Sequence, residues 1–175
     1  MCQKKVKIGI LGGSFNPAHL GHLHISKVAY KKLSLKQVWW VVSPQSPMKN
    51  EYKLNFAERL ISAENIAEGS PYIKVTDIEK KLFKNSHKFY TISLIRRLKA
   101  KYKTYEFCFI IGADNLLSLH KWYKWRQLIK EVDFVCISRE GSRYRQLASI
   151  ASKTKKIQFI EAALLKISST EIRGG

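Results

Sequence analysis

The sequence predicts a single domain, residues 1–175, of the α/β class with a mostly parallel sheet. Apolar runs rich in β-branched residues alternate with helix-like stretches along the chain, which is the pattern of repeated strand and helix units. Several runs are continuous, such as VWWVV, FCFII and FVCI, as expected for strands that helices cover on both faces. At 175 residues and 45% hydrophobic, the chain can bury one substantial core and is too short for two ordinary domains.

The expected elements follow this alternation in order, with no internal repeat and no low-complexity linker. Six apolar runs are expected to form strands: Val6–Leu11, Val38–Val42, Ile73–Thr76, Phe107–Ile111, Phe134–Ile137 and Ile157–Ile160. Five stretches between or beside them are expected to form helices: Leu20–Leu33, Phe56–Glu68, Thr91–Lys101, Trp125–Lys130 and Tyr144–Ala151. Because parallel sheets bind ligands outside the carboxyl ends of their strands, we expect the functional residues directly after strands.

The stretch GGSFNPAHLGH, residues 12–22, follows the first expected strand and suits a phosphate group. The pair Gly12–Gly13 lets the backbone turn sharply and approach a ligand without a Cβ between them. Loop amides, the Ser14 hydroxyl and the N-terminus of the next helix would face an anion. If that helix starts near Ala18, His19 and His22 stand on one face of its first turn and can donate hydrogen bonds to phosphate oxygens.

Other interpretations of this stretch are weaker. Two adjacent glycines after a strand can form a turn and nothing more. The three histidines His19, His22 and His24 could bind a metal, but no cysteine or carboxylate accompanies them locally. The glycine spacing does not match the dinucleotide fingerprint G-x-G-x-x-G, and the chain has no GK[ST] phosphate loop.

The combination G-G-S-F-N-P-x-H-x-G-H resembles the signature of the HxGH nucleotidyltransferases. Further segments resemble, in order, those of the bacterial nicotinate mononucleotide adenylyltransferase family: SPQSPMK (43–49), FYTISL (89–94), FIIGADNLLSLHKWYKW (109–125) and ISSTEIR (167–173). The resemblance therefore covers nearly the whole chain. It implies a Rossmann-like three-layer sandwich of the nucleotidyltransferase type.

The resemblance implies adenylyl transfer from ATP to nicotinate mononucleotide, giving nicotinate adenine dinucleotide and pyrophosphate in NAD biosynthesis. The attacking phosphate oxygen is already ionised at neutral pH, so the reaction needs neither a general base nor a covalent intermediate. Positioning and charge stabilisation can carry it. The sequence agrees, because it offers phosphate-binding groups and neither paired carboxylates nor a nucleophile elbow.

By this resemblance, His19 and His22 are the catalytic residues and contact the ATP phosphates. The implied ATP-binding residues are Gly12, Gly13, Ser14, Phe15, His19, His22, Lys49, Gly112, Asp114, Ser168, Ser169 and Arg173. Two of them have structural alternatives. Ser168 and Glu171 have the S-x-x-E spacing of a capping box, and Asp114 can cap the helix after FCFII.

The resemblance places nicotinate mononucleotide against Tyr90, Thr91 and Trp122. Tryptophan offers a flat surface for the pyridine ring, and backbone amides near Thr91 would read its carboxylate. An aromatic helix packed on the core is the alternative for the cluster around Trp125. Mg²⁺ is expected as cofactor, held mainly by ATP phosphates and water, with no protein metal cage.

The formal net charge of +19 leaves the partner class open. Most positive residues are lysines dispersed singly or in pairs, as on a solvated surface, and no arginine-rich arm or RNP-type motif accompanies them. We therefore expect anionic small substrates rather than nucleic acid, with a basic nucleic-acid-binding module as the alternative from another class. The chain shows no signal peptide or membrane span, so a cytoplasmic location is expected. A homo-oligomer is compatible with the sequence.

Two enzymes are the main rivals within the resemblance. Phosphopantetheine adenylyltransferase shares the first motif, but GADN, the W-Y-x-W cluster and FYTISL favour the pyridine nucleotide enzyme. A nicotinamide mononucleotide enzyme differs only in accepting the amide. The chain also departs from the family in having Asn16, where many members have aspartate, and in stopping at Gly175, where relatives usually continue into another helix. Cys2, Cys108 and Cys136 are far apart and predict no disulfide framework.

Overall fold

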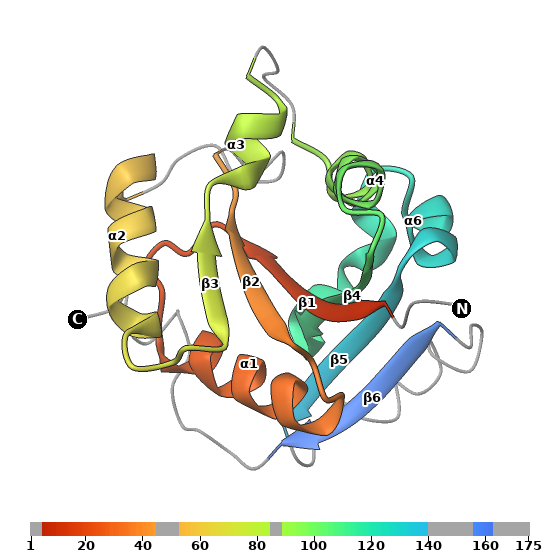
Figure 1. Ribbon diagram of the computed structural model, residues 1–175, viewed down its shortest axis with the longest axis horizontal. Coiled ribbons are helices and arrows are strands. Elements are labelled where there is room, and N and C mark those ends of the chain that lie inside the picture. Colours follow the sequence, from red (N-terminus) through yellow and green to blue (C-terminus); the bar gives the residue numbers. More distant parts are fainter. Residues whose placement is uncertain (1–4, 45–52, 85–88, 140–155, 163–175) are drawn as a thin grey trace.

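The computed structural model describes residues 5–44, 53–84, 89–139 and 156–162. They form three layers, with one sheet between two layers of helices (Figure 1). Its six strands are all parallel and lie in the order β3-β2-β1-β4-β5-β6. Their bounds are β1 Val6–Gly13, β2 Gln37–Val42, β3 Ile73–Thr76, β4 Tyr105–Gly112, β5 Asp133–Arg139 and β6 Ile157–Ala162. This confirms the expected α/β class and parallel sheet.

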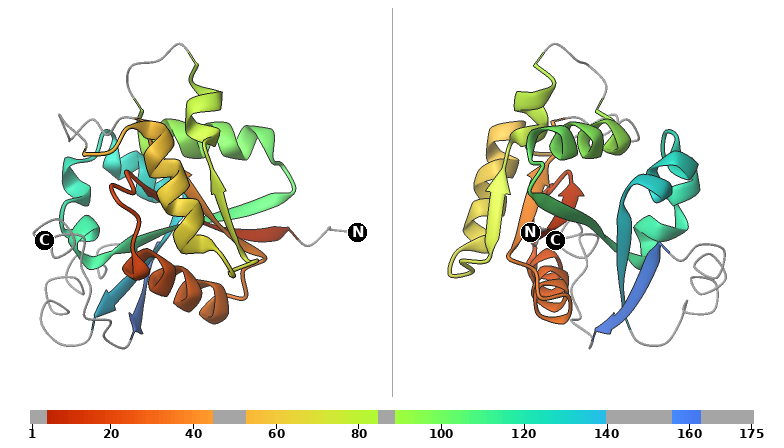
Figure 2. Two further views of the ribbon diagram at one scale, coloured as in Figure 1. Left: turned by 90° about the vertical axis from the view of Figure 1, so that its left-hand side faces the viewer. Right: turned by 45° about the vertical axis from the view of Figure 1, so that its right-hand side comes forward.

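Helices cover both faces of the sheet (Figure 2). Their bounds are α1 Leu20–Lys32, α2 Phe56–Ala67, α3 Ile78–Leu82, α4 Thr91–Lys101, α5 Ala113–Leu117 and α6 Trp125–Glu131, with a 3₁₀ turn η1 at Leu119–Lys121. Helices α1 and α2 pack on one face, and α3 to α6 pack on the other. None of the helices in the described ranges is long and apolar enough to span a membrane.

The sequence predicted every described strand and the longer helices. The strand starting at Ile73 and the helix starting at Thr91 have the predicted bounds, and no end of the other predicted elements differs by more than two residues. Three elements were not predicted: α3, α5 and η1. They have three to five residues each, which is too short for a helical period to appear in the sequence. The helix predicted at 144–151 lies outside the described residues.

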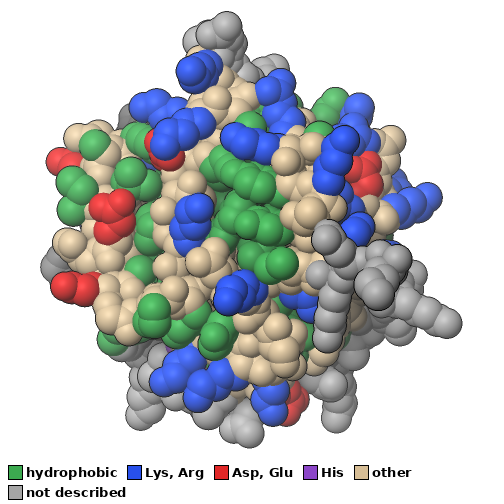
Figure 3. Space-filling view, in the orientation of Figure 1, with side chains coloured by type: hydrophobic (Ala, Val, Ile, Leu, Met, Phe, Trp, Pro, Cys, Tyr) green, Lys and Arg blue, Asp and Glu red, His purple; other side chains and the backbone are tan. Residues whose placement is uncertain are grey.

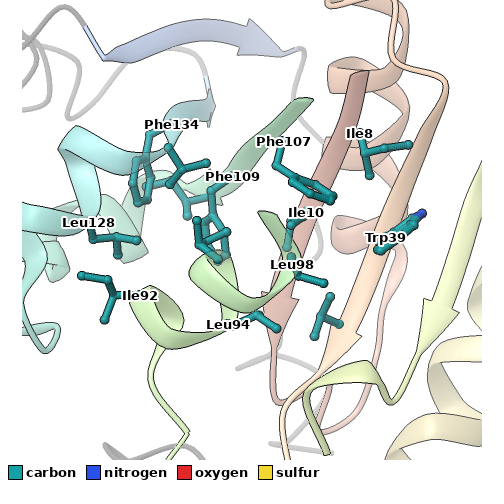
Figure 4. Close-up of a cluster of buried hydrophobic side chains, with 14 of the residues drawn as sticks. Ile8, Ile10, Trp39, Ile92, Leu94, Leu98, Phe107, Phe109, Leu128 and Phe134 are labelled. Carbon is teal, nitrogen blue, oxygen red and sulfur yellow. The ribbon is translucent and has the colours of Figure 1, made fainter. Parts of the chain in front are cut away.

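The larger hydrophobic cluster lies between the sheet and α4, α5 and α6 (Figure 4). Strand residues such as Ile10 and Phe109 meet Leu98 of α4 and Leu128 of α6, and all four are at most 2% exposed. Helix α4 runs over this face and begins at Thr91. The cluster therefore fixes the start of α4, where the mononucleotide pocket is expected.

The second cluster joins α1 and α2 to the opposite face of the sheet. Trp40 is fully buried there, and its Nε1–H donates to the Ser26 Oγ at 2.7 Å. The Ser26 hydroxyl in turn donates to the His22 carbonyl at 2.8 Å. This chain of hydrogen bonds holds α1 against β2 close to the histidine motif.

Both described cysteines are free and sit in the sheet, as the sequence indicated. Burial raises the pKa of the Cys108 and Cys136 thiols to about 12. The thiol form therefore predominates at neutral pH, and these residues act as small apolar side chains.

The strand order reverses direction between β1 and β4, and the two strands separate there. Their ladder runs from Val6–Tyr105 to Ile10–Phe109 and stops three residues before either strand ends. Both strands remain paired on their outer sides, β1 with β2 and β4 with β5. An open carboxyl edge at the reversal of strand order is where such sheets bind ligands.

Leu98→Ala should lower the free energy of unfolding by about 3 kcal/mol, because Leu98 is fully buried in the larger cluster and truncation leaves a cavity. Urea denaturation measures the change. Lys101→Ala on the exposed end of the same helix is the control and should shift it by less than about 0.5 kcal/mol. Equal effects of the two substitutions would contradict the placement of α4.

Candidate active site

The loop after β1 is anchored by Phe15. Its ring is 2% exposed and stacks on Trp40 at 5.2 Å, with the His22 ring 4.8 Å away. The backbone at Phe15 has φ of 47°, in the left-handed region that a bulky residue adopts only when its surroundings impose it. Since the side chain is buried, any contact of Phe15 with a ligand would be through its backbone.

Helix α1 begins at Leu20, and His19 is its N-cap with φ −155° and ψ 168°. This is the start predicted for the helix at Leu20–Leu33, and His19 lies just before the first turn, not within it as a start near Ala18 would have placed it. The reason is a hydrogen bond that sequence patterns do not show: the His19 Nδ1 accepts the Gly21 N–H at 3.1 Å and so acts as a capping group.

The two imidazoles form a reciprocal capping box. The His22 Nδ1 accepts the His19 backbone N–H at 3.2 Å, and the ring centroids of the two histidines are 3.8 Å apart. Because each Nδ1 accepts a hydrogen bond, the proton of the uncharged ring belongs on Nε2. Each ring is thereby set as a hydrogen-bond donor through Nε2, which suits phosphate oxygens. No acidic residue lies in the first turn of α1 to compete for an anion.

Helix α2 braces this loop from outside. The guanidinium of Arg59 is 1% exposed, and its Nη1 donates to the Ser14 carbonyl and to the Ser43 carbonyl, both at 2.7 Å. Its Nη2 donates to the Pro44 carbonyl at 2.8 Å. One buried cation thus ties the loop after β1 to the loop after β2.

Two further contacts attach the same loop to the α2 region. The Asn16 Oδ1 accepts the Leu54 N–H at 3.1 Å, and the Ser62 Oγ accepts the Ala18 N–H at 3.2 Å. The partner of Asn16 lies 38 residues away along the chain. Since only an oxygen acceptor is used, an aspartate can make the same bond, which explains why asparagine is compatible with the motif.

A buried carboxyl adjoins these loops. Glu79, in α3, is 4% exposed and is hydrogen bonded by the Ser43 side chain. Burial raises the pKa of Glu79 to about 7, and the hydrogen bond from Ser43 opposes the rise.

Two glycines, Gly12 and Gly112, lie along the open edge between β1 and β4. A Cβ at Gly12 would lie 3.1 Å from the Phe109 ring, so the backbone and this ring are closely packed. A Cβ at Gly112 would have no atom of the described residues within 4 Å, so none of these residues fills the space beside the end of β4. Asp114 is not the N-cap of α5, since Gly112 holds that position and Asp114 lies in the first turn.

The predicted mononucleotide residues come together beside α4. Tyr90 is the N-cap of α4 and Thr91 its first residue, and no described side chain caps this helix start. The Tyr90 ring stacks on Tyr123 at 4.3 Å. Trp122 is partly buried and packs edge-on against Phe109 at 6.0 Å. Phe109 therefore lies between the loop after β1 and the aromatic side chains beside α4.

Four of the predicted site residues cannot be placed. Lys49, Ser168, Ser169 and Arg173 lie outside the described residues. Within the described ranges, no group of three or more His, Cys, Asp or Glu side chains is arranged to hold a metal ion.

The sequence did not indicate Arg59, Glu79 or Tyr123 as part of the site. The position of Arg59 could have indicated its burial, because Arg59 lies on the face of α2 that contains Phe56 and Ala63, where an apolar residue is expected. Tyr123 could have been included because it follows the predicted site residue Trp122 in the sequence. Glu79 carried none, because a glutamate in a lysine-rich stretch resembles any surface residue.

Comparison with known proteins agrees with this geometry. A family model described as cytidylyltransferase-like matches residues 10–175. A relative named "Probable nicotinate-nucleotide adenylyltransferase" from Pelagibacter ubique is 42% identical, covering 98% of this chain and 94% of that protein. A protein of the same name from Parvibaculum lavamentivorans is 37% identical, covering 93% and 80%.

A solved structure has the same fold. It is that of Plasmodium falciparum nicotinic acid mononucleotide adenylyltransferase complexed with NaAD, with a TM-score of 0.80 at 24% identity, covering 97% of this chain and 83% of that one.

Glu79→Gln should make stability less dependent on pH. The folded state keeps the Glu79 proton up to about pH 7, against 4.5 for an ordinary glutamate, so the wild type loses stability as pH rises between these values. Glutamine has no proton to lose. At pH 8 the variant should therefore be more stable than the wild type by about 3 kcal/mol in urea denaturation, and equally stable near pH 4. Glu64→Gln, on the exposed side of α2, should leave the slope as it is.

Proposed function

Because the chain belongs to the cytidylyltransferase-like family, we propose that it transfers the adenylyl group of ATP to nicotinate mononucleotide, a step of NAD biosynthesis. The observation that carries the proposal is the reciprocal capping of His19 and His22, which leaves the Nε2 of both imidazoles as a hydrogen-bond donor at the start of α1. The cytoplasm is the expected location.

The reaction exchanges one phosphoanhydride bond for another. A phosphate oxygen of nicotinate mononucleotide attacks the α-phosphorus of ATP, the bond from that phosphorus to the bridging oxygen of the β-phosphate breaks, and pyrophosphate leaves with the bonding electrons. The attacking oxygen is already ionised, so no residue has to remove a proton. The protein needs to align two anions and to stabilise the negative charge that develops on the leaving group.

The two imidazoles stabilise this charge through their Nε2–H donors. Their orientation is set by the capping hydrogen bonds before ATP arrives, so little reorganisation accompanies the reaction. Loop amides at Gly13 and Phe15 and the Ser14 hydroxyl bind phosphate or nucleotide beside them. The end of β4, with Gly112 and Asp114, borders the space proposed for adenosine.

The remaining proposed ATP ligands lie outside the described residues. We propose Lys49 and Arg173 as cations for the phosphates, and Ser168 and Ser169 as hydrogen-bond donors. These roles rest on the sequence motifs.

The start of α4 supports the acid, nicotinate, over the amide. The backbone amides at Thr91 and after it lie at the positive end of an 11-residue helix that has no acidic residue in its first turn and no described side-chain cap. A carboxylate is attracted to such a place more strongly than an uncharged amide. Tyr90, Tyr123 and Trp122 supply the aromatic surfaces for the pyridine ring.

Mg²⁺ fits this site as a companion of the substrate. The described residues offer no cluster of metal ligands, and Mg²⁺ is commonly held by phosphate oxygens and water with few protein ligands. When bound, it neutralises charge on the polyphosphate. The protein's part is to hold the phosphates through the loop amides and imidazoles.

A pyrophosphate-release assay with ATP and a panel of phosphorylated acceptors tests the proposal. Nicotinate mononucleotide should give a kcat/KM at least about tenfold above that of nicotinamide mononucleotide, because only the acid gains from the start of α4. Phosphopantetheine should give no product. Equal rates with acid and amide would contradict the assigned preference, and turnover of phosphopantetheine alone would replace the proposed substrate.

His22→Asn separates capping from catalysis. The asparagine oxygen can take the place of Nδ1 and accept the His19 N–H, but no donor then reaches the Nε2 position. We expect a loss of about a hundredfold in kcat with thermal stability nearly unchanged. His24→Asn, further along α1, is the matched control and should retain activity. Full activity of His22→Asn would remove His22 from the catalytic residues.

A further inference from the structure

Glu79 is a buried carboxyl that the proposed chemistry does not use. It lies in the five-residue helix α3 with 4% of its surface exposed. Burying an ionisable group opposes folding, and an apolar side chain would fill the same space at lower cost. Packing of α3 alone therefore gives no reason for a glutamate at this position.

The contacts of Glu79 lead to the phosphate loop in two steps. The Ser43 hydroxyl donates to the Glu79 carboxylate. The Ser43 backbone N–H donates to the Gly13 carbonyl at 2.9 Å, and the Ser43 carbonyl accepts from the Arg59 Nη1 at 2.7 Å. The same Nη1 donates to the Ser14 carbonyl at 2.7 Å. Ser43 thus connects the buried Glu79 of α3 to the Arg59 guanidinium, which holds the loop after β1.

We propose that Glu79 is a positioning residue for the ATP phosphate site and acts through Ser43 and Arg59 on the loop after β1. The inference rests on the proposed adenylyl transfer and concerns how its phosphate site is held. Glu79 touches no substrate. Its carboxyl fixes the Ser43 side chain, so that the carbonyls of Ser43 and Ser14 stay close enough to share one guanidinium nitrogen.

Loss of the Glu79 carboxyl leaves Ser43 without the partner that orients it. The end of β2 can then shift, and Arg59 can keep the Ser43 carbonyl or the Ser14 carbonyl in good geometry, but not both. The phosphate loop would sample other positions, and ATP would have to select the competent one, which lowers its apparent affinity. The aromatic pocket at α4 does not depend on this contact.

Steady-state kinetics of Glu79→Ala, Ser43→Ala and the double variant test the inference. Each single variant should raise the KM for ATP about tenfold and change the KM for nicotinate mononucleotide less than about twofold. Since both substitutions remove the same contact, the double variant should be no worse than either single one. Glu79→Gln should recover most of the loss, because its amide oxygen accepts the same hydrogen bond.

Ile78→Val is the control for a merely structural role. Ile78 precedes Glu79 in α3 and is 7% exposed in the larger cluster, so its truncation should lower the melting temperature without moving the KM for ATP. If Glu79→Ala does not fold, Ser43→Ala and Glu79→Gln remain. An unchanged KM for ATP in Ser43→Ala would overturn the inference. A double variant whose KM for ATP rises by the product of the two single increases would overturn it as well.

Binding of a non-hydrolysable ATP analogue, measured by calorimetry, separates the inference from the proposed function. If the wild type does not use nicotinate mononucleotide, the proposed function fails, while a roughly tenfold weaker analogue affinity in Ser43→Ala still supports the positioning role. If the wild type turns over and the variants bind the analogue as tightly as it does, the positioning role is wrong and the proposed function stands.

Discussion

One buried guanidinium holds the two loops on which the site is built. Arg59 is 1% exposed and donates to three carbonyls, those of Ser14, Ser43 and Pro44. A buried cation depends on its hydrogen bonds, so any movement that separates these carbonyls would raise the free energy of the folded state considerably. The outer helix α2 therefore dictates where the loops after β1 and β2 lie, although neither loop belongs to it.

The histidines combine structural and chemical roles in the same atoms. Their Nδ1 nitrogens complete the N-terminus of α1, and this leaves the proton of each uncharged ring on Nε2. Ordinarily a serine or aspartate caps a helix and has no further donor to offer. Here the cap itself carries the two ring donors that we propose for phosphate, and the fully buried Trp40 and Phe15 pack close to the His22 ring. The capping hydrogen bonds thus orient both rings.

The positive surface charge suits the anionic substrates proposed, but it is dispersed and does not indicate where the site lies. Lysine and arginine side chains are dispersed over the face in Figure 3, around a patch of apolar side chains, and acidic ones are few. ATP and nicotinate mononucleotide are both anions, so a net charge of +19 favours their approach at low salt. In the proposed function, local geometry discriminates between them: we propose imidazoles and loop amides for the polyphosphate, and aromatic rings and a helix start for the pyridine acid.

The sequence by itself determined the alternation of strands and helices and the motif after β1, because apolar periodicity and glycine turns are local properties. It also placed Tyr90, Thr91 and Trp122, the residues proposed for the mononucleotide, in segments that the fold brings to one edge. Only the tertiary structure decided that His19 is a cap, that Arg59 joins two loops, and that Glu79 is buried against Ser43. These depend on partners between 15 and 45 residues away or on a single turn of backbone, and no local pattern encodes such pairings.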